Sequence, residues 1–222
     1  MSRYRLVAVP ALITLAVTLV RLFGELQHWS ATMFRRDPGG LGALVGIIWL
    51  APIFGVYFAL KLVKSGAGPA SPARAVANAF MGVGVFLGWA VLSLLLVQPE
   101  RDTVPRPAQF QVQVITGAAA ALGVVILQMR GWAALCETLL VYAAAARVPV
   151  VTVMLLAIFG GWGTHYDAFP AGFPLTGAFE KWFWGGALVQ MTIHLGNTVL
   201  LGCLFGSLGA AWVPRKRRSE VA

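Results

Sequence analysis

The sequence predicts an all-α integral membrane protein, a bundle of six transmembrane helices with both termini in the cytoplasm. The first observation is the composition, since 59% of the 222 residues are hydrophobic and 11% are charged. Soluble domains average roughly 45–50% apolar and about 25% charged residues. The second observation is a series of six apolar runs, each long enough for the ~20 residues that cross a bilayer as a helix. The runs lack the alternating pattern of membrane β-strands, which favours helices.

We expect one transmembrane domain over residues 1–222, because six spans leave little length for anything else. The spans are predicted at about residues 6–23, 41–63, 75–97, 110–129, 132–159 and 182–213. A segment rich in glycine and aromatic residues, 160–181, separates the last two spans. It is predicted to form a hairpin on the outer side of the membrane.

The first run follows Arg3 and Arg5, a charged start that resembles the beginning of a secretory signal peptide. No small-x-small cleavage site comes after the apolar stretch, where Arg21 and Glu25 stand instead. We therefore expect this segment to remain as a span.

Charged or helix-breaking residues bound the next three runs. The second run begins after residues 35–40 and ends at Lys61 and Lys64. A Gly-, Pro- and Ala-rich linker, residues 65–74, leads to the third run, and a proline-broken stretch, residues 98–107, leads from the third to the fourth. These features are typical of short turns between membrane helices.

The fifth run is the longest, and as a straight helix it would extend ~42 Å, more than the ~30 Å of the hydrocarbon core. Pro149 predicts a kink in it, because proline cannot donate to the carbonyl of Ala145. The freed carbonyl would lie beside Arg147. The sixth run ends at a basic tail, residues 215–218.

The orientation follows from the positions of Lys and Arg, which are enriched on the cytoplasmic side of membrane proteins. With the N-terminus inside, ten of these residues lie inside and five outside, and Arg21 and Arg147 lie within the helices. The inside set is Arg3, Arg5, Lys61, Lys64, Arg74, Arg130, Arg215, Lys216, Arg217 and Arg218. This bias and the hydropathy indicate a bacterial inner-membrane protein.

Several functional classes have no support in the sequence. The net charge of +9 lies at the ends of the runs, where it suits anionic lipid, so we expect no nucleic-acid partner. Cys136 and Cys203 stand in apolar runs without Cys-x-x-Cys spacing, which is typical of buried free thiols. The sequence has no His-Glu-x-x-His, Gly-x-Ser-x-Gly or Walker motif. The three histidines lack ligand spacing, so no metal and no cofactor are expected.

Five polar residues of the first run share one helical stripe if the helix continues through the last of them. They are Thr14, Thr18, Arg21, Glu25 and His28. The stripe is interpreted either as a polar path or anion site, with Glu25 or His28 carrying protons, or as a structural Arg21–Glu25 pair at i,i+4.

Arg147 is predicted near the depth of Arg21, and two arginines at one depth repel unless an anion lies between them. Glu25 and Asp167 are the candidates within the chain. A lipid phosphate or an anionic solute is the candidate outside it, because guanidinium binds such groups bidentately. A structural pair and an anion site both fit this pattern.

Further polar residues stand in the last two segments. Gln190, His194 and Asn197 share a face of the sixth run, as interhelical hydrogen-bonding groups or as a proton relay. In the hairpin, His165 and Asp167 could form an acid–base pair, or Asp167 could cap a turn. Glu137 is expected to pair with Lys61 near the inner interface.

Close helix packing is predicted at three Gly-x-x-x-Gly pairs, which serve contacts within a bundle and between subunits alike. They are Gly42 and Gly46, Gly84 and Gly88, and Gly202 and Gly206. Membrane lipids, some of them anionic, are expected partners, together with a second copy or a partner in a membrane complex.

The leading functional hypothesis is a non-enzymatic membrane protein that binds or conducts a small anionic or protonatable ligand through a polar cluster in the outer half of the membrane. Its candidate ligand-binding residues are Arg21, Glu25, His28, Arg147, His165, Asp167, Gln190 and His194. One alternative is an accessory or scaffold subunit of a membrane complex. Another is an intramembrane enzyme for lipid-linked phosphates, with His165 or His28 as base and the two arginines holding the phosphate.

Overall fold

The computed structural model describes residues 3–38, 45–96 and 106–212, and every regular element in these ranges is helical. The elements are α1 (Arg3–Leu26), α2 (Leu50–Lys64), α3 (Pro72–Leu96), α4 (Pro107–Gly160), α5 (Ala178–Glu180), the π-helical segments η2 (Lys181–Leu188) and η3 (Gln190–His194), and α6 (Leu195–Ala211). Among the described residues, four helical stretches are long and apolar enough to cross a membrane. They are Tyr4–Leu26, Pro72–Leu95, Pro107–Gly160 and Ala178–Ala211. The predicted all-α class is confirmed at this level.

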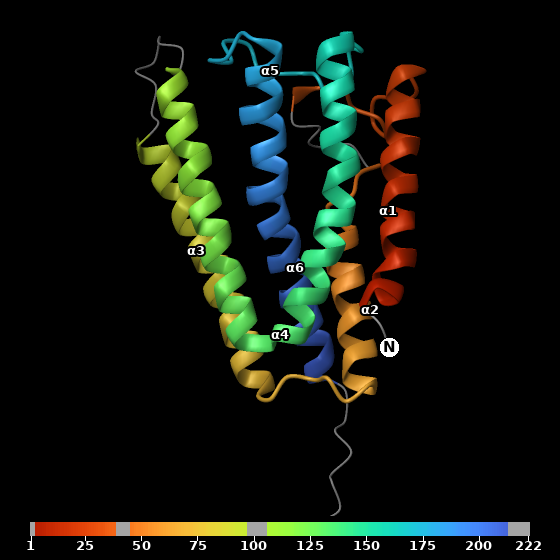
Figure 1. The fold of residues 1–222 in the computed structure, drawn as a ribbon, viewed down its shortest axis with the longest axis vertical. Coiled ribbons are helices and arrows are strands. Elements are labelled where there is room, and N and C mark those ends of the chain that lie inside the picture. The colour runs from red at the N-terminus through yellow and green to blue at the C-terminus, as the bar shows by residue number, and fades with distance from the viewer. Residues whose placement is uncertain (1–2, 39–44, 97–105, 213–222) are drawn as a thin grey trace, which may run out of the picture.

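The longest helix, α4, covers both the fourth and the fifth predicted runs. Trp132 breaks it with φ −153° and ψ 85°, and Figure 1 shows the chain descending along one limb to the bend and rising along the other. The buried Trp132 indole donates its Nε1–H to the carbonyl of Ala67, 2.9 Å away in the α2–α3 connection. Gly131 allows the close approach, since a Cβ there would lie 3.3 Å from the Cα of Ala75. The fourth and fifth predicted spans are therefore separated only by a break at one residue. The helix continues through Pro149.

Helix α6 lies inside the bundle, where it packs against α2, α3 and α4 (Figure 1). At the α2–α6 crossing two glycines let the backbones meet, because a Cβ at Gly55 would lie 2.3 Å from the carbonyl oxygen of Gly202. The rings of Phe54 and Phe58 pack at an angle to that of Tyr142, with centroids 5.4 and 5.6 Å away. These aromatic contacts fix α2 against the second limb of α4, residues 133–160.

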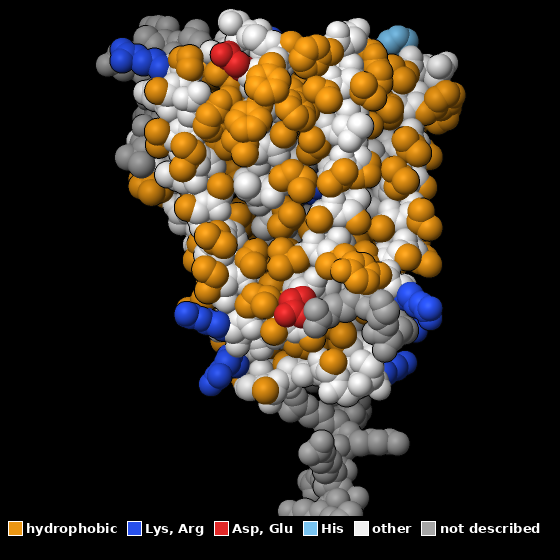
Figure 2. Space-filling model, in the orientation of Figure 1, with side chains coloured by type: hydrophobic (Ala, Val, Ile, Leu, Met, Phe, Trp, Pro, Cys, Tyr) orange, Lys and Arg blue, Asp and Glu red, His pale blue; other side chains and the backbone are white. Residues whose placement is uncertain are grey.

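The outer surface of the bundle is apolar, as expected for helices that face lipid. Figure 2 shows hydrophobic side chains over most of the height of this face, with basic side chains near its lower end. Large exposed side chains on three different helices include Leu12, Leu94 and Leu122, which are 63%, 72% and 61% exposed. The free thiols of Cys136 and Cys203 are buried, as predicted.

Helix α1 ends earlier than the predicted stripe requires. It stops at Leu26, and His28 adopts a left-handed conformation with φ 55°. The N–H of Trp29 bonds the carbonyl of Gly24 at 2.9 Å, and that of His28 bonds the carbonyl of Glu25 at 3.2 Å. This is a Schellman motif, which terminates the helix. His28 therefore does not lie on the stripe, and its imidazole contacts Arg36 in the following loop.

The second predicted span begins too early. Residues 41–44 lie outside the described ranges, residues 45–49 are not helical, and α2 starts at Leu50. The N–H of Val45 instead donates to the carbonyl of Met33 at 3.1 Å, and the guanidinium of Arg21 packs against Gly46. Glycine is a poor helix former, so these tertiary contacts determine the local backbone.

The glycine contact between α2 and α6 gives a prediction about stability. Gly55→Ala should lower the free energy of unfolding by about 1–3 kcal/mol, because the new methyl group meets the Gly202 backbone. Gly84→Ala on α3 is the matched control, since its Cβ position has no atom within 4 Å. It should change stability by less than about 1 kcal/mol. Unfolding in mixed detergent micelles measures both, and equal effects would contradict the prediction.

Candidate functional site

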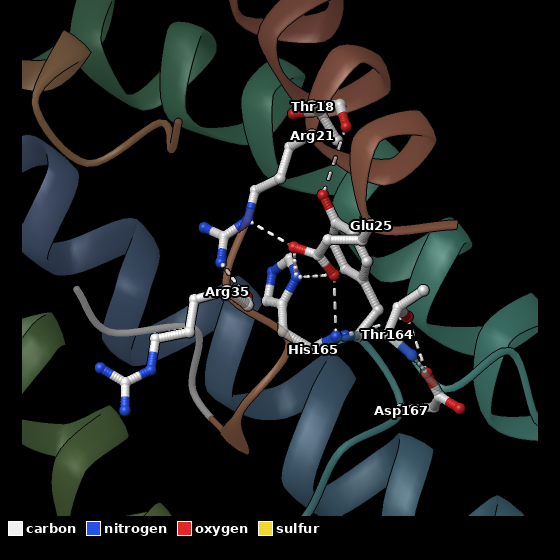
Figure 3. A network of polar contacts seen from close by, with 8 residues as sticks. Thr18, Arg21, Glu25, Arg35, Thr164, His165 and Asp167 are labelled. Atoms are coloured by element: carbon white, nitrogen blue, oxygen red, sulfur yellow. Dashed lines mark hydrogen bonds and ion pairs between the residues drawn. The ribbon is translucent and has the colours of Figure 1, made fainter. Parts of the chain in front are cut away.

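The first of two buried polar clusters lies at the end of α1 and centres on Glu25, which is 1% exposed. Its carboxylate accepts a hydrogen bond from Arg21 Nε at 2.8 Å and one from the backbone N–H of His165 at 2.9 Å (Figure 3). The Nδ1 of His165 lies 2.6 and 2.8 Å from the two carboxylate oxygens. Both oxygens of Glu25 are therefore satisfied, and the cluster fixes the α4–α5 connection against α1.

The i,i+4 spacing of Arg21 and Glu25 places their side chains together on α1. Asp167 brings His165 into position, because it holds the turn in which His165 stands. Its carboxylate accepts bonds from the N–H groups of Gly163 and Thr164 at 2.8 and 2.7 Å, and from the Thr164 hydroxyl at 2.7 Å. The carboxylate that bonds His165 is that of Glu25, so Asp167 takes the turn-capping role and not the acid–base role (Figure 3).

The electrostatic balance of this cluster depends on His165, which lies outside the candidate spans. Burial lowers the pKa of its imidazole, and the hydrogen bond to Glu25 opposes this effect. A neutral ring that donates from Nδ1 leaves one positive charge, on Arg21, opposite one negative charge, on Glu25. The neighbouring Tyr166 is buried too, and burial raises the pKa of its phenol. We call this cluster closed, because its charges balance and both oxygens of Glu25 have hydrogen-bond partners.

The polar stripe of α1 continues from this cluster into the bundle. Tyr166 donates to the carbonyl of Thr18 at 3.4 Å, and Thr18 Oγ1 donates to the carbonyl of Thr14 at 3.0 Å. Thr14 Oγ1 donates to the carbonyl of Pro10, so the hydroxyl of Tyr142 is the donor in its 2.8 Å bond to Thr14. The stripe faces protein along this length, and it joins α1 to the second limb of α4.

The second cluster centres on Arg147, which is 7% exposed on the second limb of α4. Its Nη1 donates to the side-chain oxygen of Gln190 at 3.0 Å, and its Nη2 donates to the hydroxyl of Thr198 at 3.0 Å. Thr198 in turn donates to the carbonyl of His194 at 2.9 Å. The Nε–H of Arg147 is buried and has no hydrogen-bond partner.

Arg147 forms no ion pair with any Asp or Glu in the described part of the chain. The expected pair with Glu25 or Asp167 does not form, because both carboxylates have other partners in the first cluster. Arg21 bonds Glu25, whereas Arg147 bonds Gln190 and Thr198, so the two arginines expected in one cluster belong to two. The Arg147 cluster consists of a cation held by neutral oxygens.

The segment opposite Arg147 is π-helical, from Lys181 to Leu188 and from Gln190 to His194. π-Helical turns are rare and occur frequently at functional sites. The segment contains Gly185 and Gly186, which disfavour a regular α-helix. Gln190 lies in it, whereas Thr198 lies on the α-helix that follows. Sequence reasoning missed Thr198, although its spacing of four from His194 is a signal for the same face.

The ammonium of Lys61 lies over the ring of Tyr57, 5.7 Å from its centroid, and the Glu137–Lys61 pair stays a prediction. No group of three His, Cys, Asp or Glu side chains suited to a metal occurs within residues 3–38, 45–96 and 106–212.

The first cluster gives a prediction about stability. Glu25→Gln should lower the free energy of unfolding by about 3 kcal/mol, because the buried Arg21 loses its counter-ion and His165 loses an acceptor. Asp37→Asn is the matched control, since the Arg35–Asp37 pair is more than half exposed, and it should cost less than about 1 kcal/mol. Unfolding curves test the difference, and hydrogen exchange of residues 161–167 should rise in Glu25→Gln alone.

His165 gives a prediction about pH. Its pKa is lower in the folded protein than the ~6.5 of an unfolded chain, so the stability due to neutral His165 is complete above about pH 6.5. This stability falls as the pH drops from ~6.5 toward the folded pKa, by at most about 1.4 kcal/mol per pH unit. His165→Asn should remove this part of the pH dependence of the melting temperature. A His165-dependent gain in stability on acidification would contradict the prediction.

The two clusters differ in one respect that bears on function: the Glu25 cluster is closed, and the Arg147 cluster keeps an unused donor on a buried cation. No family model, curated protein or solved structure matches this chain.

Proposed function

We propose that this protein is a multi-pass membrane protein that binds a small anion inside the bundle, at Arg147. The observation that carries the proposal is the buried guanidinium, with its free Nε–H and no carboxylate partner among the described residues. A charge in a membrane interior is costly and is usually paired or functional. Neutral oxygens from Gln190 and Thr198 offset only part of this cost.

The proposed topology has six spans with both termini in the cytoplasm of a bacterial cell, in the inner membrane. The bend of α4 supports it, since its two limbs can each cross the bilayer (Figure 1). Helix α2 has 15 residues and would cross together with the segment before it. The excess of Lys and Arg on one side supports the orientation.

The free groups around Arg147 are donors, as an anion requires. Because arginine only donates, the atom of Gln190 that bonds Arg147 is the side-chain oxygen. The amide N–H groups of Gln190 therefore point away from the guanidinium. These N–H groups make no hydrogen bond to a described residue, and neither does the imidazole of His194. Donors without a hydrogen-bond partner therefore occur on Arg147, Gln190 and His194, and no carboxylate of a described residue pairs with the guanidinium.

Charge and depth favour a small solute with one negative charge, such as a carboxylate. Arg147 supplies one positive charge, which a monoanion balances. Arg147 lies 15 residues after Trp132 and 13 before Gly160, so ~20 Å of helix separates it from each end. Phospholipid phosphates stay at the interface of the ~30 Å core, which favours a solute over a headgroup.

A scaffold role is the second candidate, supported by one observation on α3. Gly84 and Gly88 have no atom within 4 Å of their Cβ positions, and Leu87 and Val91 beside them are exposed. Such a surface suits close packing of another membrane helix. The lipid-phosphate enzyme has less support, because Arg21 and Arg147 have separate partners.

The anion site is tested with two arginine variants. Wild-type protein in phosphatidylcholine nanodiscs should bind L-lactate, measured by calorimetry, and Arg147→Gln should weaken binding by about 10- to 100-fold through loss of a charged donor. Arg35→Gln is the matched control, because the Arg35–Asp37 pair is more than half exposed, and it should leave affinity within about threefold.

Three results would count against this assignment. Absence of lactate binding by the wild type would contradict it, as would equal losses in both variants. Native mass spectrometry of nanodiscs that also contain phosphatidylglycerol separates the two sources of anion. A lipid retained through Arg147, with no lactate bound, would identify a headgroup site.

A further inference from the structure

His194 lies between the two residues that hold Arg147. Gln190, His194 and Thr198 follow one another at intervals of four, and the first and last both accept a hydrogen bond from the guanidinium of Arg147. Residues at this spacing share one helical face, and the wider π-helical turn of Gln190–His194 keeps them in register. His194 therefore lies on the helical face that meets the guanidinium of Arg147.

The His194 side chain is not committed to the fold. Its backbone carbonyl accepts from Thr198, but its imidazole forms no hydrogen bond to any residue of the described chain. Buried or half-buried histidines usually have a partner for at least one ring nitrogen. The contrast with His165, whose Nδ1 is held by Glu25, shows what a structural histidine looks like in this protein.

The elements packed against η3 are α4, η2 and α6. Helix α6 carries Cys203 as its titratable side chain, and η2 carries Lys181 at its first position. The titratable and charged side chains of the described α4 are Arg130, Cys136, Glu137, Tyr142 and Arg147. Among all these groups, Arg147 is the one held by the residues four before and four after His194. The protonation of His194 is therefore linked to whatever neutralises Arg147.

We propose that the anion binds at Arg147 together with a proton, which is taken up by the imidazole of His194. The inference rests on the proposed function, since it describes the same site. An empty site holds the Arg147 charge, which disfavours a second positive charge beside it. A bound anion cancels that charge and attracts the proton, so binding of the one promotes binding of the other. The coupling is reciprocal, and the anion therefore binds more tightly as the pH falls.

The chemistry is a protonation equilibrium without covalent change. A monoanion enters with its charge of minus one, a proton from water adds to a free nitrogen of His194, and the net charge of the site is the same before and after. The anion and the proton together carry no net charge, so they cross a low-dielectric region at much lower cost than the anion alone. The substrate class that follows is a small monocarboxylate accompanied by one proton.

The test counts protons during binding. Titration of wild-type protein with L-lactate in two buffers of different ionisation enthalpy, near pH 7.5 where free histidine is mostly neutral, should show close to one proton taken up per lactate. Affinity should rise by up to about tenfold per pH unit as the pH falls from about 8 toward 5. Lactate stays ionised over this range, so the proton belongs to the protein.

Two histidine variants assign the proton. His194→Gln should reduce the count to zero and flatten the pH dependence of affinity, whereas His165→Asn should keep both. If His194→Gln does not fold, the wild-type proton count and the His165→Asn count still decide the question. Lactate binding with no proton uptake would overturn the inference and leave the Arg147 site intact. Absence of lactate binding would overturn the proposed function, and the inference with it.

Discussion

The cost of placing an arginine in a low-dielectric interior is the constraint on which this structure depends. The chain meets it in two ways. Arg21 has a carboxylate one turn away on the same helix, and the arrangement is completed by His165. Arg147 is balanced by the neutral oxygens of Gln190 and Thr198, and one of its donors remains unused. One arginine is therefore paired with a carboxylate, and the other keeps a donor without a partner.

The fold holds Arg147 next to these neutral oxygens. The bend at Trp132 lets one helix supply two limbs, and the glycine contact between α2 and α6 holds α6 inside the bundle. Gln190, His194 and Thr198 are thereby presented to Arg147 by a helix that cannot move away without opening the Gly55–Gly202 contact. The π-helical turns are the departure from regular geometry, and they lie where the cation is held.

The sequence was sufficient for the helical membrane class and for the polar residues, because run length and charge position report them directly. It also predicted the Arg21–Glu25 pair from its i,i+4 spacing, but it could not show which residues far apart in the sequence meet. The division into two clusters depends on the left-handed His28, on the Asp167 turn and on the bend at Trp132, which are tertiary features. Thr198 was missed because a hydroxyl in an apolar run reads as a packing residue until its partner is known.

The closed cluster also bears on how the open one is used. Glu25 and His165 join the α4–α5 connection to α1, and the stripe of threonines joins α1 to Tyr142 on the limb that carries Arg147. A ligand that draws Arg147 away from Gln190 or Thr198 therefore acts on a limb whose position is already fixed from the α1 side. The π-helical segment is the other side of the Arg147 cluster, because it supplies Gln190, and π-helical turns occur frequently at functional sites. In the proposed function, the η2–η3 segment is therefore the element that responds to an anion at Arg147.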